Sequence, residues 1–253
     1  MKNKKYLLVF RLLVSILSIS VLFLIWEFAA RKIDKPAFIP TFSSTADAFF
    51  KLIRTAAFWK TVFASLYRIF VGLALGILLG GVLSLVSHRV ALLSSFINTV
   101  MGIIKATPVA SIIIIIWIMV GSVNVPTAIA ILMVCPIIWQ AMNEGLNSRN
   151  NEMEEVAEVF QMSRRKRIRY ILIPRIIKHL SPALLTSVGL AWKSGVAAEI
   201  ISVTKNSIGY YIKTNKDTFD AEYMFAWTGA VVIISLLFEL VIKNLTRRIK
   251  GNA

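Results

Sequence analysis

The sequence has a single cysteine among its 253 residues and only two histidines. Cys135 lies in an apolar run and has no second cysteine to pair with, so an internal disulfide is excluded. His88 and His179 are far apart in the sequence, without cysteines or a carboxylate cluster near them, and we predict no metal site. The sequence also lacks a Ser/His/Asp arrangement, a glycine-rich phosphate loop and paired catalytic carboxylates. These absences argue against an enzyme that acts alone.

Acidic residues are also scarce, since 13 Asp and Glu oppose 29 Lys and Arg, for a formal net charge of +16. Such a surplus can indicate a nucleic-acid-binding protein, but here the basic residues stand between long apolar runs. The chain is 57% hydrophobic, with a mean hydropathy of +0.72, whereas soluble domains are roughly 45–50% apolar. We therefore predict an all-α integral membrane protein with no nucleic-acid partner, whose basic residues orient it and contact anionic lipid headgroups.

The first apolar run covers Leu12 to Ala30 and follows a basic start. A signal peptide has the same order of features, but its apolar core is roughly 7–15 residues, and this run is about long enough to cross a membrane. Trp26 and Glu27 near its end are typical of an interfacial anchor, so we predict an uncleaved first span. After a linker, a cap signal at Ser43-Ser44 leads to an expected amphipathic helix over 46–55 on the outer face of the membrane.

The second span is predicted over residues 62–86 and carries Gly72, Gly76 and Gly80 at intervals of four. Because a helix face without side chains lets another helix approach closely, these glycines predict tight helix packing instead of a ligand site. We expect a short turn at His88-Arg89 to follow.

The third apolar run, from Leu92 to Gly121, is too long for one straight crossing. Lys105, Thr107 and Pro108 interrupt it. The run is therefore either one tilted, kinked span or a partly broken one.

Three further spans bring the predicted number to six, and the turn Ser122–Asn124 precedes the first of them. They cover residues 126–142, 182–203 and 224–242. Six spans place both termini and the loop 145–178 on one side, which carries 17 of the 29 Lys and Arg residues, against nine on the other side. This bias predicts a cytoplasmic loop. We divide the chain into an N-terminal part (1–56), a transmembrane domain (57–246) and a C-terminal tail (247–253).

Lys105, Lys193 and Glu199 are ionisable and fall inside predicted spans. A charge at membrane depth costs about 2.5–3.5 kcal/mol on insertion scales, so such side chains face protein or water. Lys193 and Glu199 are six residues apart and do not share a helix face, so each is expected to pair with another helix. Interior pairing and contact with an anionic substrate are both open at this point. Arg68 and Glu239 lie nearer span ends and are predicted to be anchors. The candidate translocation path comprises Lys105, Thr107, Lys193, Ser194 and Glu199.

The longest charge-dense segment runs from Asn151 to Lys178, acidic in its first half and basic in its second. Asn151 and Glu154 have the spacing of a capping box, and Ser163 is positioned to cap a second helix, which we expect to end before Pro174. We predict two short helices joined by a turn at Gln161-Met162 and projecting from the membrane. Charge alone would make this an ordinary positive-inside loop, but the predicted shape suits docking into a groove of another protein.

This segment resembles the cytoplasmic EAA loop in the membrane subunits of binding-protein-dependent ABC importers. That family's pattern is Glu-Ala-Ala, three residues, Gly, nine residues and Ile-x-Leu-Pro. The chain has Glu155-Val156-Ala157, then Gln161 where the glycine falls, then Ile171 and Pro174 in register. Gln161 is the main departure, because glycine is favoured where a helix ends in a left-handed turn.

Four other stretches resemble the nitrate, sulfonate, taurine and thiamine-precursor branch of that family. They are Lys105–Ala110, Gly189–Ile200, Ser207–Tyr210 and Phe225–Trp227. The resemblance therefore covers most of the chain.

The resemblance implies a type I ABC importer transmembrane domain that lines an alternating-access path for a small anionic, sulfonate, nitrate or thiamine-precursor type of solute. The implied partners are a pair of cytoplasmic ATP-binding subunits, a second permease copy in a homodimer and an extracytoplasmic solute-binding protein. ATP would be bound by the partner, and no cofactor by this chain. The implied setting is a prokaryotic plasma or inner membrane, with both termini cytoplasmic. The implied coupling residues are Glu155, Val156, Ala157, Gln161, Ile171 and Pro174.

A self-sufficient secondary transporter or channel is the alternative function, and a membrane-embedded enzyme or assembly factor is a third. Secondary transporters often show internal repeats and charge relays at the midplane. We find no repeat between the two halves of the sequence and no Asp/His chain. An obligate ATPase partner separates the importer from both alternatives.

Overall fold

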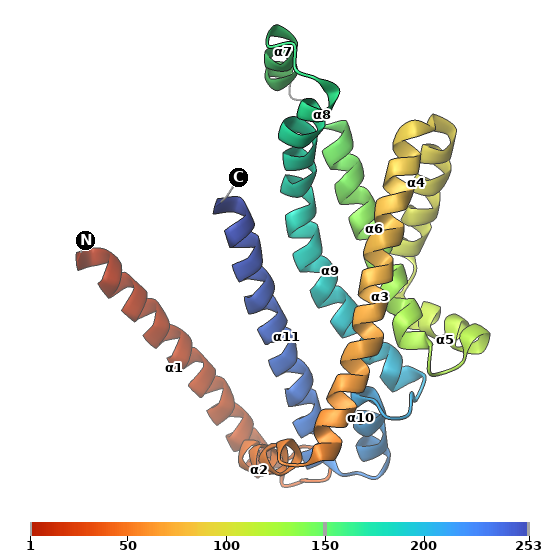
Figure 1. The fold of residues 1–253 in the computed structure, drawn as a ribbon. Coiled ribbons are helices and arrows are strands. Elements are labelled where there is room, and N and C mark those ends of the chain that lie inside the picture. Colours follow the sequence, from red (N-terminus) through yellow and green to blue (C-terminus); the bar gives the residue numbers. More distant parts are fainter. Residues whose placement is uncertain (1, 149–150, 252–253) are drawn as a thin grey trace. The chain divides into compact units, whose positions relative to one another are not determined.

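The computed structural model describes the backbone of residues 2–148 and 151–251, and every regular element in these ranges is a helix (Figure 1). Five described helices are long and apolar enough to cross a membrane, and a bent pair of shorter helices makes a sixth span if counted as one. The prediction of an all-α membrane protein with about six spans is confirmed. The chain divides into two compact units, Met1–Lys60 with Tyr211–Ala230, and Thr61–Tyr210 with Val231–Ala253.

The first unit contains α1 (Lys2–Ile33), α2 (Phe42–Ile53) and the beginning of α11 (Ala221–Gly251). The indole N–H of Trp26 donates to the Pro40 carbonyl at 3.0 Å and so fastens the linker to α1. The ring of Trp227 stacks between those of Phe58 and Tyr211, with centroid distances of 5.0 Å to each. Aromatic stacking thus joins three segments that are distant in the sequence.

Helix α2 begins earlier than predicted, at Phe42 instead of residue 46. The cap is Thr41, whose hydroxyl oxygen accepts the Ser44 N–H at 3.1 Å. The Ser43-Ser44 signal was therefore placed two residues too late, because these serines already lie in the first turn.

In the second unit, α3 (Ala56–Arg89) lies against α6 (Val125–Asn147) at the predicted glycine positions. A Cβ on Gly72 would lie 2.5 Å from the Thr127 carbonyl oxygen, and one on Gly80 would lie 2.6 Å from the Cys135 carbonyl oxygen. The two backbones touch because these side chains are missing. The predicted turn at His88-Arg89 is wrong, since both residues are in the last turn of α3.

The third apolar run is a broken span. The helix axis bends by 105° between α4 (Ala91–Ala106) and α5 (Val109–Val120). Pro108 lacks a backbone N–H and disfavours helical backbone at Thr107, which is extended. The twelve residues of α5 reach only about 18 Å, less than the ~30 Å of a bilayer core.

The charged segment forms α7 (Asn151–Val159) and α8 (Arg164–Arg167) at one end of α6 and α9 (Figure 1). A π-helical turn (Ile168–Leu172) then leads directly into α9 (Ile173–Ile201). The expectation that helical backbone fades before Pro174 is wrong, because it continues from α8 through the π-helical turn into α9. The wider turn, in which the Ile173 N–H donates to the Ile168 carbonyl, accommodates the N–H that Pro174 lacks.

Two boundaries predicted near the other end of α9 also differ. The fifth span starts before Pro182, which lies inside α9. The predicted outer loop 204–223 contains a further helix, α10 (Ile208–Asp217), which sequence reasoning missed.

Candidate functional site

Helix α7 ends in a left-handed turn at Gln161, whose φ is +46°. The Met162 N–H donates to the Ala157 carbonyl at 2.9 Å, and the Gln161 N–H donates to the Glu158 carbonyl at 2.9 Å. These two bonds are those of the Schellman motif, in which glycine is preferred at the left-handed position. The chain therefore makes this turn with glutamine.

One face of α7 and the turn after it expose apolar side chains. Val159 is 79% exposed and Phe160 75%, and Met153 and Val156 are also more than 45% exposed. Ala157 is fully buried, and Glu155 is exposed. Sequence reasoning named Val156 and missed the others, although positions 153, 156 and 160 have the i, i+3, i+7 spacing of a helix that docks in a groove.

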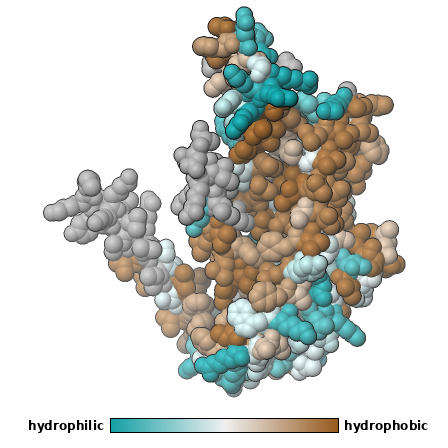
Figure 2. Space-filling model, viewed as in Figure 1, coloured by the Kyte–Doolittle hydropathy of each residue, from teal (hydrophilic) through white to brown (hydrophobic). Residues whose placement is uncertain are grey.

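The apolar side chains of α7 stand out because their surroundings are hydrophilic. Figure 2 shows hydrophilic residues gathered over α7 and α8, and hydrophobic residues over the helices below them. The exposed apolar side chains of α7 thus form a small patch at a polar end of the second unit.

Two ion pairs connect α7 to the segment that follows it. Glu154 lies 3.9 Å from the guanidinium of Arg175 on α9, and Glu158 lies 3.9 Å from that of Arg167 on α8. Arg175 also donates to the Ser148 carbonyl at the end of α6. Arg175 was not among the predicted site residues, and it joins α6, α7 and α9.

The remaining predicted loop residues take up supporting positions. Ile171 is half-buried in the π-helical turn, and Pro174 is exposed in the first turn of α9. Ser163 is at the N-cap of α8, but its hydroxyl makes no capping hydrogen bond. The predicted capping box depends on the side chain of Asn151, which lies outside the described side chains.

Lys105 lies at the end of α4, beside the break, and its ammonium donates to the side-chain carbonyl of Gln140 on α6. The Gln140 amide donates in turn to Glu144 at 2.8 Å. These residues line a cavity of about 420 Å³ between α4 and α6, together with Asn98, Trp139, Asn143 and Asn147. So many amides inside membrane-spanning helices indicate a water-accessible cavity.

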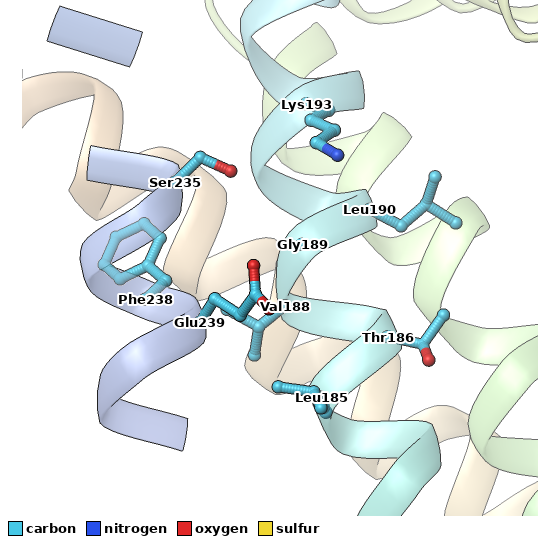
Figure 3. A pocket seen from close by; sticks show the side chains of 9 residues that line it. All are labelled: Leu185, Thr186, Val188, Gly189, Leu190, Lys193, Ser235, Phe238 and Glu239. Atoms are coloured by element: carbon cyan, nitrogen blue, oxygen red, sulfur yellow. The ribbon is translucent and has the colours of Figure 1, made fainter. Parts of the chain in front are cut away.

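Lys193 lines a second cavity, of about 340 Å³, between α9 and α11 (Figure 3). The side chains that carry the Lys193 ammonium and the Glu239 carboxylate both line this space. Neither group makes a hydrogen bond or ion pair with any residue in the described part of the chain. Within the described residues, Lys193 is therefore not paired with another helix, contrary to the sequence-based expectation.

Glu199 is fully buried and binds the beginning of α10. One carboxylate oxygen accepts the Ser65 hydroxyl at 2.9 Å and the Gly209 N–H at 3.2 Å. The Ser65 hydroxyl oxygen accepts the Ile208 N–H at 3.0 Å. A carboxylate at a helix N-terminus is favoured by the helix dipole, and here it fastens α3, α9 and α10 together.

Arg68 belongs to the same cluster, and its predicted role as an anchor at a span end is wrong. Its guanidinium lies 3.9 Å from Glu199 and donates to the Asn206 carbonyl at 3.2 Å. Glu199 thus pairs with another helix, as expected.

The five candidate path residues lie in separate surroundings. Thr107 donates to the Ile103 carbonyl and Ser194 to the Leu190 carbonyl, each within its own helix. Glu199 is enclosed by protein, whereas Lys105 and Lys193 each line a cavity. The described residues include no group of three or more metal-ligating side chains.

Comparison with known proteins gives a family match over residues 72–251, to a model described as "Binding-protein-dependent transport system inner membrane component". The taurine transport system permease protein TauC of Escherichia coli is 21% identical over 231 residues, covering 88% of this chain and 83% of TauC. The bicarbonate transport system permease protein CmpB of Synechococcus elongatus is 24% identical, covering 77% and 70%. The formylaminopyrimidine transport permease protein ThiX of Halalkalibacterium halodurans is 25% identical, covering 89% and 90%.

Proposed function

The chain belongs to the family of binding-protein-dependent transport system inner membrane components, and on that premise we propose that it is the permease subunit of an ATP-driven ABC importer. Its spans would form the translocation path, and α7 would dock on a cytoplasmic ATP-binding subunit. A second permease copy and an extracytoplasmic solute-binding protein would complete the complex.

The exposed apolar face of α7 carries this proposal. Val156, Val159 and Phe160 are exposed at a polar end of the second unit. A helix with apolar side chains at such spacing binds in a hydrophobic groove of a partner. Because Arg175 of α9 pairs with Glu154 of α7, movement of a docked ATPase would be transmitted to α9 as a rigid-body displacement.

The solute is proposed to be a small anion. The relatives include permeases named for bicarbonate, nitrate and aliphatic sulfonates, which all carry anionic oxygen atoms. Lys105 supports this choice, since the partner of its ammonium is a neutral amide oxygen, and no carboxylate among the described residues forms a direct ion pair with it. A cation without a direct ion pair in a water-accessible cavity attracts anions, and the Glu144 carboxylate in the same lining opposes this attraction only in part because it is engaged by Gln140 and lies beside His179.

The proposal is tested by reversing the charge on the docking face. In Glu155→Arg, we expect ATP hydrolysis by the complex to lose its stimulation by the solute-loaded binding protein, because a new cation stands where the partner meets a carboxylate. Membrane insertion should be unaffected. The measurement is ATPase activity of the purified complex in lipid nanodiscs, after co-purification in mild detergent.

Glu222→Arg is the matched control, since it makes the same charge change in the first turn of α11, away from the loop in sequence. Normal stimulation in Glu155→Arg would contradict the docking assignment. A protein that purifies without an ATPase and transports when reconstituted alone would establish the secondary carrier instead.

A further inference from the structure

A continuous series of polar contacts runs from Lys105 to α7. Its first half lies along α6, where Lys105 donates to Gln140 and the Gln140 amide donates to Glu144 at 2.8 Å. The second carboxylate oxygen of Glu144 lies 3.8 Å from Nδ1 of His179 on α9. The series thus passes from α4 through α6 to α9.

The second half of the series returns to the end of α6 and reaches α7. Nε2 of His179 lies 3.4 Å from the Ser148 hydroxyl. The Ser148 carbonyl accepts from Arg175, whose guanidinium lies 3.9 Å from Glu154 of α7. The Arg175 side chain is only 15% exposed, so it is held in place between these partners.

The helices that carry this series are packed closely. At Gly145 a Cβ would lie 2.9 Å from the Cα of Ile176, so α6 and α9 touch through their backbones between Glu144 and Ser148. Packed interfaces of this kind move as units and do not deform continuously. A displacement of α7 would therefore move α9 and α6 together, and the side chain of Gln140 on α6 would move by a similar distance.

The other end of the series, at Lys105, lies beside a break between two helices that is able to move. Lys105 is in the last turn of α4, two residues before the extended Thr107 at the 105° break. Hinges are formed by a few residues at the ends of elements, and the break between α4 and α5 has this character. Lys105 also lines the 420 Å³ cavity in which we expect the anion to pass.

From this geometry we propose that Gln140, Glu144, Ser148, Arg175 and His179 form a polar relay that couples the position of α7 to the position of Lys105. The five are positioning residues: they set where the Lys105 ammonium stands in the cavity when the docked ATPase changes state. This inference rests on the proposed docking of α7 on an ATPase, and it names the route by which that partner controls the anion-binding cavity.

The test measures how the ATPase state changes access to the cavity. The background variant is Cys135→Ala with Asn98→Cys, which places a single thiol in the cavity wall. The complex of this variant with its ATPase is reconstituted in nanodiscs and labelled with a polar maleimide. Labelling is measured in two states, one without nucleotide and one with ATP plus vanadate. We expect the two labelling rates to differ in the background variant, and the ratio of these rates is the readout.

Two variants interrupt the relay at its two ends, Gln140→Leu and Arg175→Leu. In each, we expect the ratio of the two labelling rates to move toward one. The expected change in this ratio is about 2-fold to 30-fold, which corresponds to a loss of about 0.5–2 kcal/mol of coupling free energy. Arg167→Leu is the matched control, because Arg167 pairs with Glu158 within the loop and has no contact in the relay. Its ratio should stay at the background value.

A conservative variant separates coupling from simple support of Lys105. Gln140→Glu keeps an acceptor for Lys105 but replaces the amide donor to Glu144, so it should reduce the ratio as Gln140→Leu does. Arg175→Lys should give an intermediate ratio, because an ammonium cannot hold two partners in the forked geometry of a guanidinium. These two variants decide the question if a leucine variant fails to assemble.

The outcomes are distinct. An unchanged ratio in the Gln140 and Arg175 variants would overturn the relay and leave ATPase docking intact. A background variant that binds an ATPase but shows no nucleotide response, or that binds none, would overturn the proposed function and the relay with it. A loss of thermal stability with an unchanged ratio would show a merely structural role.

Discussion

At the scale of single residues, Gln161 shows how the chain keeps a turn without the residue that favours it. With φ of +46°, its Cβ crowds the following carbonyl, which costs an L-residue about 1–2 kcal/mol. Val203, after α9, and Phe219, after α10, hold the same left-handed backbone. Asp34, directly after α1, has the same kind of backbone with φ of +49°. Among the described residues, four helix ends therefore carry conformational strain at residues other than glycine.

The strain at Gln161 predicts that Gln161→Gly makes the end of α7 more stable. Glycine removes the Cβ, and part of the gain is offset by its larger freedom in the open state, so we expect a net gain of about 0.5–1 kcal/mol. The measurement is hydrogen exchange of the Met162 amide, which donates to the Ala157 carbonyl in this turn. Exchange should slow about twofold to fivefold.

Gln161→Ala is the control, because alanine keeps the Cβ and removes the rest of the side chain. It should exchange as the parent does. If alanine and glycine slowed exchange equally, the effect would come from the glutamine side chain and the account of backbone strain would be wrong.

Sequence reasoning found single residues where a local pattern marks them. The register of Glu155, Ala157 and Pro174 needs no knowledge of the fold, and neither does the left-handed turn implied at Gln161. Glu199 and Ser65, in contrast, are 134 residues apart and meet only because α3 packs on α9. No local pattern predicts that contact, and the same holds for Arg175 and Ser148.

At the scale of elements, the small residues of α3 determine how closely α6 approaches. The Cβ that Gly80→Ala adds would stand 2.6 Å from the Cys135 carbonyl oxygen, a backbone atom that cannot rotate away. We expect this variant to separate the helices and to destabilise the protein by about 1–3 kcal/mol, as other overpacked interiors do. The measurement is the midpoint of thermal unfolding in detergent.

Gly102→Ala supplies the comparison, because a Cβ at Gly102 on α4 would meet no atom within 4 Å. Alanine is a better helix former there, so this variant should be neutral or more stable by roughly 0.5–1 kcal/mol. A Gly80→Ala protein that unfolds no earlier than Gly102→Ala would show that α3 and α6 are free to adjust.

Most spans could be predicted because hydrophobic length alone defines them. The break at Pro108 was predictable as an alternative, since proline restricts its own residue and the one before it. Pro174 misled the prediction for the same local reason, because a π-helical turn absorbs its missing N–H. Helix α10 has few apolar residues, and the carboxylate of Glu199 from another helix stabilises its beginning, so its own sequence did not reveal it.

At the scale of the whole molecule, the distribution of charge predicts the orientation in the membrane. Of the 29 Lys and Arg residues, 17 fall on the side that carries the α7 loop and both termini, and nine on the other side. Because basic loops are retained in the cytoplasm, the α7 loop should face inward and α10 outward. The proposed docking of α7 on a cytoplasmic ATPase requires the same orientation.

This orientation is tested with single thiols in a Cys135→Ala background. Ser163→Cys, at the exposed start of α8, should react with a membrane-impermeant maleimide only after the cells are permeabilised. Lys216→Cys, on the exposed side of α10, should react in intact cells. The reverse pattern would place α7 outside, away from any ATP, and would remove the energy source from the proposed importer. Labelling of both thiols in intact cells would instead require an even number of spans between them, which is incompatible with α9 as the one crossing that separates residues 163 and 216.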